Sequence, residues 1–234
     1  MVERLTSEQR LAYRSAGALP FAGSLPEEII APARDIALVL ARQAPDQDML
    51  SGIHNPFGHH ACVAQAWSFL DIAENPQLLD CVEDVIGPDI ILWDVELYLG
   101  QLFLPPDEGQ CWPVEPLKGT IVVLSLERAE FGLIDIVKLT QGTAGFTNGW
   151  NATLAMRYIP ATSHFNRDQA FPANRRATEV RPLVNYTKRP IWLVRGDDRA
   201  GNDFATGFMV PAARWTNASL DDADARRRQP RSAG

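Results

Sequence analysis

The chain has 234 residues, 46% of them hydrophobic and 9% aromatic, and its 22 basic and 29 acidic residues give a formal net charge of -7. This length and composition allow one sizeable core in one domain, and the negative charge repels phosphate backbones, which excludes nucleic acid as a partner. The first ten residues are polar and charged, without the apolar stretch of an export signal or a membrane span. We therefore expect a cytoplasmic protein that binds neither nucleic acid nor a membrane.

Four helices are predicted in the first part of the chain, where polar caps, prolines and apolar residues at helical spacing recur. They cover residues 6–15, 24–42, 62–72 and 75–87. The second has a strong start, because Ser24 can cap it and Pro26 suits a first turn. The fourth starts at Asn75 and stops at Gly87, a residue that favours a helix end.

After these helices the sequence changes to short runs of branched and aromatic residues, bounded by glycine, proline or polar clusters. Strands are expected over residues 90–104, 120–126, 132–139, 152–159 and 190–194. Helices followed by strands predict an α+β domain in which the helices cover one side of an antiparallel sheet or barrel. One domain should span residues 1–220, and the charged residues 221–234 should form a disordered tail.

Several stretches resemble the phytanoyl-CoA dioxygenase family. They are His-Asn-Pro at 54–56, the run at 75–90, Gly-Gln-Cys-Trp-Pro at 109–113, Leu-Ala-Met-Arg-Tyr-Ile-Pro at 154–160, and residues 189–196. The resemblance spans nearly the whole chain. It implies N-terminal helices packed on a double-stranded β-helix, or jelly roll, that holds Fe(II) with two histidines and one carboxylate and binds 2-oxoglutarate.

The positions that would hold the iron differ from the family pattern. In the register set by residues 109–112, Pro106 stands where the first histidine belongs and Glu108 stands at the carboxylate. In the register of the later strand, Thr140 replaces the second histidine, and residues 149–151 replace the arginine that grips 2-oxoglutarate. The resemblance therefore implies a degenerate member without iron or 2-oxoglutarate, on a barrel shortened by missing strands.

Two carboxylates are the candidate catalytic groups. Period two on the strand from Ile90 places Glu96 with Asp94 and Tyr98 on one face, opposite Trp93. If Glu96 and Glu108 entered a desolvated pocket, burial would raise a carboxyl pKa and allow general acid or base chemistry near neutral pH. The alternative places Glu96 on a solvated outer face and Glu108 on a rim loop.

Three further residues are candidates for binding a substrate. Gln110 and Trp112 flank the predicted metal position, where the first can hydrogen-bond and the second can stack on a ligand, although Trp112 equally suits core packing. Arg157 would pair with a ligand carboxylate or with an internal acid such as Asp135, because a buried arginine needs an anionic partner. We favour the internal pair.

Three functions remain open from the sequence. The first is a small-molecule-binding protein or a metal-independent isomerase or cyclase on this scaffold. The second is an active Fe(II)/2-oxoglutarate dioxygenase in which ligands such as His164 join Glu108. The third is a decayed homologue without function. A shortened sheet also leaves room for a homo-oligomer in which another subunit covers the exposed edge.

Overall fold

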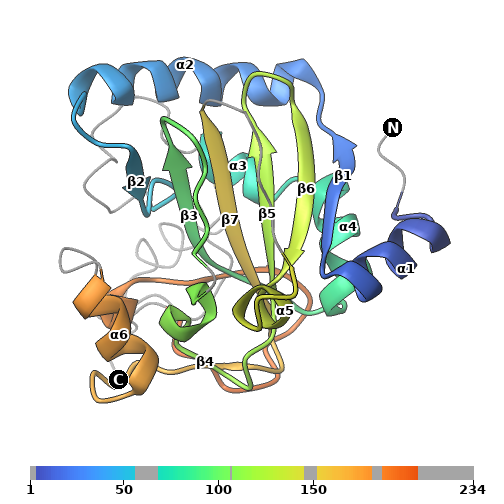
Figure 1. Ribbon diagram of the computed structural model, residues 1–234, viewed down its shortest axis with the longest axis vertical. Helices are drawn as coiled ribbons and strands as arrows, with labels where there is room; N and C mark the ends of the chain where they lie inside the picture. The colour runs from blue at the N-terminus through green and yellow to red at the C-terminus, as the bar shows by residue number, and fades with distance from the viewer. Residues whose placement is uncertain (1–3, 56–67, 106, 145–151, 181–185, 205–234) are drawn as a thin grey trace, which may run out of the picture.

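The computed structural model describes residues 4–55, 68–105, 107–144, 152–180 and 186–204. These residues form a mixed arrangement of helices and antiparallel strands (Figure 1). The described strands are β1 (Ala18–Ser24), β2 (Met49–Ser51), β3 (Ile90–Tyr98), β4 (Val114–Glu115), β5 (Thr120–Ser125), β6 (Glu130–Asp135), β7 (Thr153–Pro160), β8 (His164–Phe165) and β9 (Trp192–Arg195). The described helices are α1 (Ser7–Ala16), α2 (Glu27–Gln43), α3 (Ser68–Ala73), α4 (Pro76–Ile86), α5 (Ile136–Thr140) and α6 (Pro172–Val180), with 3-10 turns η2 (Glu108–Cys111) and η3 (Tyr186–Lys188).

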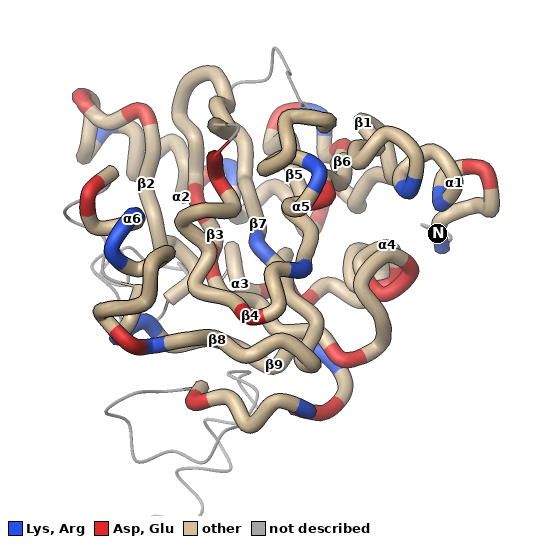
Figure 2. Tube along the Cα trace, turned by 60° about the horizontal axis from the view of Figure 1, so that its bottom comes forward, with Lys and Arg blue, Asp and Glu red and all other residues tan. Residues whose placement is uncertain are grey.

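One antiparallel sheet carries most of the described strands, in the order β1-β6-β5-β7-β3-β2, with β9 also pairing with β3. β4 and β8 form a separate pair beyond one end of the long strands (Figures 1 and 2). The two long strands β3 and β7 pair along nearly their whole length and lie in the interior of the sheet. The backbones of β3 and β7 are therefore flanked by other strands, and their side chains point into the cores on the two faces of the sheet.

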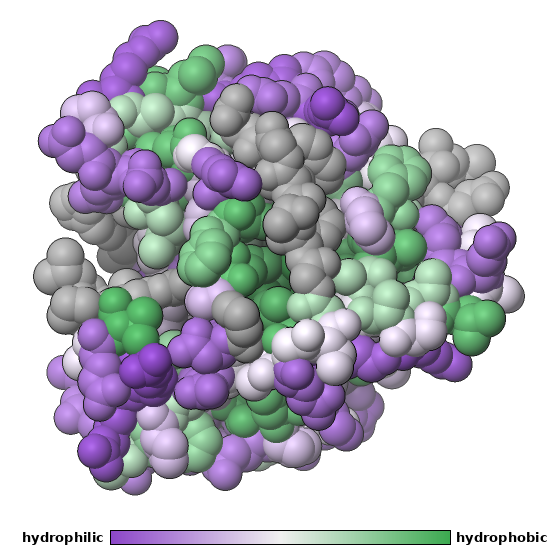
Figure 3. Space-filling view, in the orientation of Figure 1, coloured by the Kyte–Doolittle hydropathy of each residue, from purple (hydrophilic) through white to green (hydrophobic). Residues whose placement is uncertain are grey.

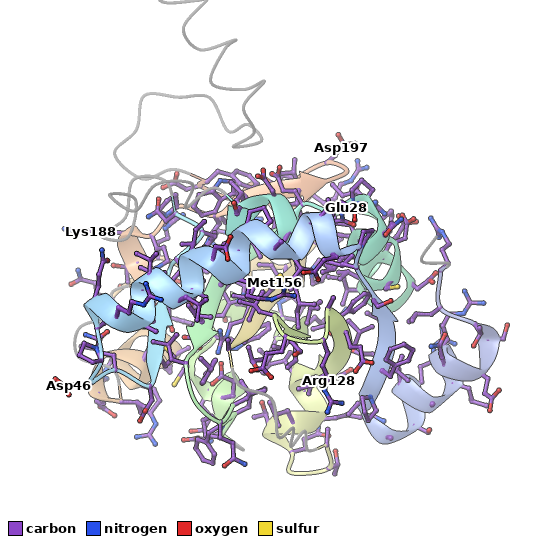
Figure 4. The ribbon with its side chains drawn as sticks, turned by 90° about the horizontal axis from the view of Figure 1, so that it is seen from above. Glu28, Asp46, Arg128, Met156, Lys188 and Asp197 are labelled. Atoms are coloured by element: carbon purple, nitrogen blue, oxygen red, sulfur yellow. The ribbon has the colours of Figure 1, made fainter. Side chains whose placement is uncertain are left out.

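The two faces of the sheet pack against different partners. One face joins apolar residues of α2, α3 and α4 in the main core, and α3 and α4 lie behind the sheet in Figure 1. Met156 of β7 belongs to this core, and Figure 4 shows it in the middle of the molecule beneath α2. The opposite face carries a second, aromatic-rich core that η2, α5, α6 and η3 help to cover. Charged groups on that second face are therefore enclosed by aromatic side chains.

A bulge in β3 changes which side chains share a face. The pairing of β3 with β7 shifts its register between Leu92 and Asp94. Because the extra residue resets the alternation, Trp93 lies in the same aromatic core as Tyr98, while Val95 packs in the helix-covered core. The predicted placement of Trp93 opposite Tyr98 is therefore wrong.

The predicted elements are largely confirmed, although α6 and the short strands β2, β4 and β8 were not predicted. Three further differences have a local cause. Residues 136–139 are helical instead of extended, because the Asp135 carboxylate accepts hydrogen bonds from the amides of Val137 and Lys138 at 2.8 and 3.0 Å and so caps α5. The strand predicted over residues 90–104 ends at Tyr98. Strand β1 was not predicted, since its proline and glycine mark it as loop, yet it lies at the edge of the sheet, where proline is tolerated.

Other predictions fall partly outside the described residues. The first six residues of the predicted third helix, and the tail over 221–234, are in this group. β5 passes directly into β6: the amide of Ala129 donates to the carbonyl of Ser125 at 2.9 Å, closing a tight turn. Among the described helices, none is long and apolar enough to cross a bilayer.

Gly196 follows β9 and allows us to predict a large local effect on stability. Its φ of 72° is unfavourable for other residues, and an added Cβ would lie 2.2 Å from Asp89 Oδ1 and 2.8 Å from the carbonyl oxygen of Pro88. Gly201 has nearly the same φ, 71°, but an added Cβ there would meet nothing within 4 Å. Gly201→Ala should therefore cost about 1 kcal/mol of unfolding free energy from backbone strain alone, and Gly196→Ala about 3 kcal/mol or more.

Urea unfolding of the two variants measures both costs on the same scale. Because the backbone strain is matched, the difference between them isolates the steric contact with Asp89 and Pro88. Equal costs for the two substitutions would contradict the tight packing of this turn against the start of β3.

Candidate functional site

Arg157 lies at the centre of the aromatic face of the sheet, on β7, and is completely buried. Its Nη2 atom lies 2.7 Å from Glu96 Oε2 and 2.7 Å from Glu108 Oε1, and its Nε–H donates to the same Glu108 oxygen at 2.8 Å. Pairing of Asp94 with Arg157 and of Glu96 with Ala155 places Glu96 diagonally across from the guanidinium. The first turn of η2 brings Glu108 over the sheet from a distant part of the sequence.

Aromatic side chains complete this buried ion-pair cluster, by which we mean Arg157, Glu96 and Glu108. The Tyr98 hydroxyl donates to Glu96 Oε2 at 2.9 Å, and the Trp112 indole N–H donates to Glu108 Oε1 at 3.4 Å. The Trp93 ring lies 6.0 Å from the guanidinium carbon, within reach of a cation–π attraction. The carboxylates are thus fixed from two sides, by the guanidinium and by aromatic donors.

The charge of Arg157 is held by its two partners. Burial acts to lower the pKa of the guanidinium, and the negative charges of Glu108 and Glu96 act to raise it. The net effect raises the pKa of Arg157 well above its ordinary value. The cluster therefore contains a permanent positive charge in a site from which water is excluded.

The structure separates the alternatives that the sequence left open for these residues. Glu96 and Glu108 are 0% and 3% exposed, so their placement on a solvated face and a rim loop is wrong. The internal pairing of Arg157 is confirmed, but its partners are these two glutamates and not Asp135, which caps α5. The catalytic roles of Glu96 and Glu108 stay predictions.

A surface groove lies next to the cluster and is lined by residues of η2 and α6. The face of the molecule in Figure 3 carries apolar residues between patches of hydrophilic ones. The volume of the groove is about 400 Å³, which is within the usual range for a small-molecule site. Gln110, Trp112, Leu117 and Phe171 are among its lining residues, and Arg176 lies at its edge, 3.0 Å from Asp107. Both Gln110 and Trp112, predicted to bind a substrate, therefore meet in one groove.

Trp112 connects the groove to the buried cluster. It lines the groove although only 1% of its surface is exposed, and its indole N–H points at Glu108. Its ring also meets Trp93 edge to face, with centroids 5.2 Å apart. Trp112 therefore packs in the core, as one of its two predicted roles requires, and its stacking on a ligand stays a prediction.

Thr140 stands at the position predicted for the second histidine, and Glu108 stands at the position predicted for the carboxylate. The segments that carry these two residues are neighbours in the structure. An added Cβ at Gly109, the neighbour of Glu108, would lie 2.0 Å from Thr140 Oγ1. The Thr140 hydroxyl donates to the carbonyl of Ile136, one turn earlier in α5, at 2.7 Å. The segment of Thr140 and the segment of Glu108 are therefore neighbours in the structure, as the register drawn from the sequence predicted.

A second polar cluster, formed by His54, Arg189 and Asp94, lies near the first. His54 is 1% exposed, and its ring meets Trp192 at a centroid distance of 4.6 Å. Within the described part of the chain, neither ring nitrogen has a hydrogen-bond partner. Burial, with a smaller contribution from the positive charge of Arg189, lowers the pKa of His54 well below its ordinary value. The burial of His54 was not predicted from the sequence.

Arg189 closes this second cluster by pairing with Asp94. Its Nη1 donates to Asp94 Oδ1 and, at 3.1 Å, to the hydroxyl of Ser51, and its guanidinium carbon lies 5.0 Å from the Tyr186 ring. Asp94 and Glu96 could have signalled both clusters in advance, because two acidic residues within an otherwise apolar strand need buried partners. What the sequence could not give was the identity of those partners.

The donor set of the described residues does not fit an iron centre of two histidines and one carboxylate. Within these residues, no group of three His, Cys, Asp or Glu side chains is placed to hold a metal ion. His164, the ligand considered for an active enzyme, is exposed on β8 opposite Glu115, whereas Glu108 is buried. His59, His60 and Pro106 lie outside the described residues.

No protein-family model matches the sequence, and no curated protein matches it. Solved structures do resemble the fold. CytC3 aligns with a TM-score of 0.53 at 16% identity, over 86% of this chain and 94% of its own. CytC3 with Fe(II) and alpha-ketoglutarate aligns with a TM-score of 0.53 at 13% identity, over 86% and 93%. The apo form of ThoJ, a non-heme monooxygenase, gives a TM-score of 0.51 at 13% identity, over 93% and 94%.

These likenesses concern the fold, because the sequence identities are low. The alignments cover 86% and 93% of this chain and 94% of each of the two similar chains. The chain therefore shares the fold of CytC3 and ThoJ, a mixed arrangement of helices and an antiparallel sheet, and the double-stranded β-helix stays a prediction.

Proposed function

We propose that this chain is a small-molecule-binding protein built on a shortened double-stranded β-helix of the phytanoyl-CoA dioxygenase type, with a degenerate, metal-independent centre. The observation that carries the proposal is the buried guanidinium of Arg157, whose contacts take up Glu96 and Glu108. Glu108 is the carboxylate that the family resemblance assigns to iron. In this chain an arginine side chain supplies the positive charge at that carboxylate.

The groove between η2 and α6 is the proposed ligand site. It offers an apolar wall from Trp112 and Phe171 and an exposed amide from Gln110, which is the usual composition of a small-molecule site. Its floor reaches the cluster through Trp112. A ligand there would bind by apolar contact and by hydrogen bonds to the Gln110 amide.

A binding module fits these contacts better than an isomerase or cyclase. Glu108 and Glu96 would have to exchange protons with a ligand in order to act as acid and base. Both already face a permanent cation at 2.7 Å, and Trp112 separates Glu108 from the groove. We keep acid-base catalysis by these two residues as the enzymatic form of the same proposal, together with cytoplasmic location and a possible homo-oligomer.

The first test follows thermal stability during titration with Fe(II), Mn(II) and 2-oxoglutarate, separately and together. Since a ligand that binds only the folded state raises Tm, we expect no change with metal or cosubstrate and no succinate. A panel of small aromatic and aliphatic acids and amides, screened in the same way, should contain compounds that raise Tm.

The groove itself can be tested with two matched variants. Ala173 lines the groove, whereas Ala170 is exposed and does not line it. Ala173→Phe should fill the groove and abolish the Tm rise caused by those compounds, while Ala170→Phe should leave it intact. Loss of the response in both variants, or in neither, would contradict the assignment of the site.

The alternative function is an active Fe(II)/2-oxoglutarate dioxygenase. It is favoured by the fold shared with CytC3, whose structure was solved with Fe(II) and alpha-ketoglutarate. A joint rise in Tm with Fe(II) and 2-oxoglutarate, accompanied by succinate formation, would establish this function and overturn the metal-independent proposal. Failure of the chain to unfold cooperatively would instead support a decayed homologue.

A further inference from the structure

We propose that Glu96 and Glu108 form a cation site which the protein fills with its own side chain, and that removing the guanidinium of Arg157 opens this site to a divalent metal. The proposal rests on the metal-independent centre described above. The metal would be a hard cation such as Mn²⁺, because the donors are carboxylate oxygens.

The geometry around Arg157 is that of a cation between two carboxylates. A single atom, Nη2, lies 2.7 Å from an oxygen of Glu96 and 2.7 Å from an oxygen of Glu108. Hard divalent cations bind carboxylate oxygens at about 2.0–2.6 Å, depending on the metal. The two oxygens would therefore move by only a few tenths of an ångström to bind a metal at the place of Nη2.

Burial makes a cation necessary at this place. The two carboxylates are 0% and 3% exposed, and Arg157 is the positively charged residue that contacts both. Charges removed from water are costly unless they are paired. Without the guanidinium, the pair would take up protons, bind another cation or rearrange.

The surrounding donors would orient the two carboxylates for a metal as they do for the guanidinium. Tyr98 donates to Glu96 and Trp112 donates to Glu108, in each case to the oxygen that contacts Nη2. Hydrogen bonds of this kind fix metal ligands from behind. The ligand oxygens are therefore held in place by groups other than Arg157.

Arg157→Met is the appropriate variant, because Met keeps an unbranched stem of similar length and removes the planar charged end. The control is Arg157→Met combined with Glu96→Gln and Glu108→Gln, which removes the carboxylates as well. Mn²⁺ binding to the full chain is measured by electron paramagnetic resonance and by calorimetry. We expect Mn²⁺ to bind Arg157→Met at least about tenfold more tightly than it binds the wild type or the triple variant.

Arg157→Met has a second readout if it does not fold without metal. Because metal binding contributes directly to folding, refolding in the presence of Mn²⁺ should then restore a cooperative unfolding transition. The inference is overturned if Mn²⁺ neither binds the folded variant more tightly than it binds the triple variant nor restores folding.

The experiments distinguish failure of the latent cation site from failure of the proposed function. Binding of Fe(II) or Mn(II) to the wild type with 2-oxoglutarate would overturn the metal-independent centre. Failure of Arg157→Met to take up Mn²⁺, with an inert wild type, would overturn the latent cation site alone.

Discussion

In the absence of metal, Arg157→Met should lower the free energy of unfolding by about 3–5 kcal/mol, because it leaves two buried carboxylates without their cation. The loss should appear as a lower urea midpoint at pH 7. A matched control is Arg176→Met, since Arg176 also pairs with a carboxylate at 3.0 Å but lies at the surface, where both side chains are exposed. Its midpoint should change little, because solvent screens such pairs.

A second comparison separates charge from packing. The triple variant with Arg157→Met, Glu96→Gln and Glu108→Gln removes the charges together, and it should be more stable than Arg157→Met alone. If Arg157→Met unfolded at the midpoint of Arg176→Met, the cluster would not be the buried, charged unit that the distances describe.

Acidification should destabilise the protein through His54. Burial and the nearby Arg189 charge lower the pKa of His54 in the folded state, so its imidazole stays neutral there. The unfolded chain takes up a proton near pH 6.5 and the folded chain does not, which favours unfolding as the pH falls. The contribution is therefore absent above about pH 7 and grows by about 1.4 kcal/mol per pH unit below pH 6.5, until the folded pKa is reached.

His54→Phe is the variant that tests this dependence. Phenylalanine keeps a ring against Trp192 and removes both buried nitrogens. We expect its unfolding free energy to match or exceed that of the wild type at pH 7.5, and its advantage to widen steadily towards pH 5. Because carboxylates titrate in both proteins, the difference between the two curves is the measured quantity. Parallel curves over this range would show that His54 is protonated in the fold or reaches solvent there.

The fold was predictable to the extent that local patterns decide it. Caps located α1 and α4, proline marked the start of α2, and branched runs located β5, β7 and β9. The predicted cap of α2 was wrong, because Ser24 ends β1 and makes no cap hydrogen bond to the helix. Two errors have the same physical origin, a single residue that overrides the pattern. Asp135 turns the end of a strand-like run into α5, and the bulge beside Trp93 exchanges the faces of β3.

The sequence predicted which residues form the candidate site, but not which of these residues contact one another. Glu96, Glu108, Arg157 and Trp112 were all chosen from the sequence, and the structure places them in direct contact. Which carboxylate meets the arginine depends on the register of β3 with β7 and on the path of η2, and neither is encoded locally. His54 was missed because its burial comes from contacts with Trp192, far away in the chain.

The position of β1 at the edge of the sheet affects the order in which the chain folds during synthesis. Ala18 pairs with Ile134 and Ser24 with Glu130, so during synthesis β1 has no partner until β6 has been made. Its docking closes a long loop, which is slow and comes after local hairpins such as β5–β6. During synthesis, α1, β1 and α2 must therefore wait with their apolar faces uncovered, and chaperone demand should be greatest in that interval.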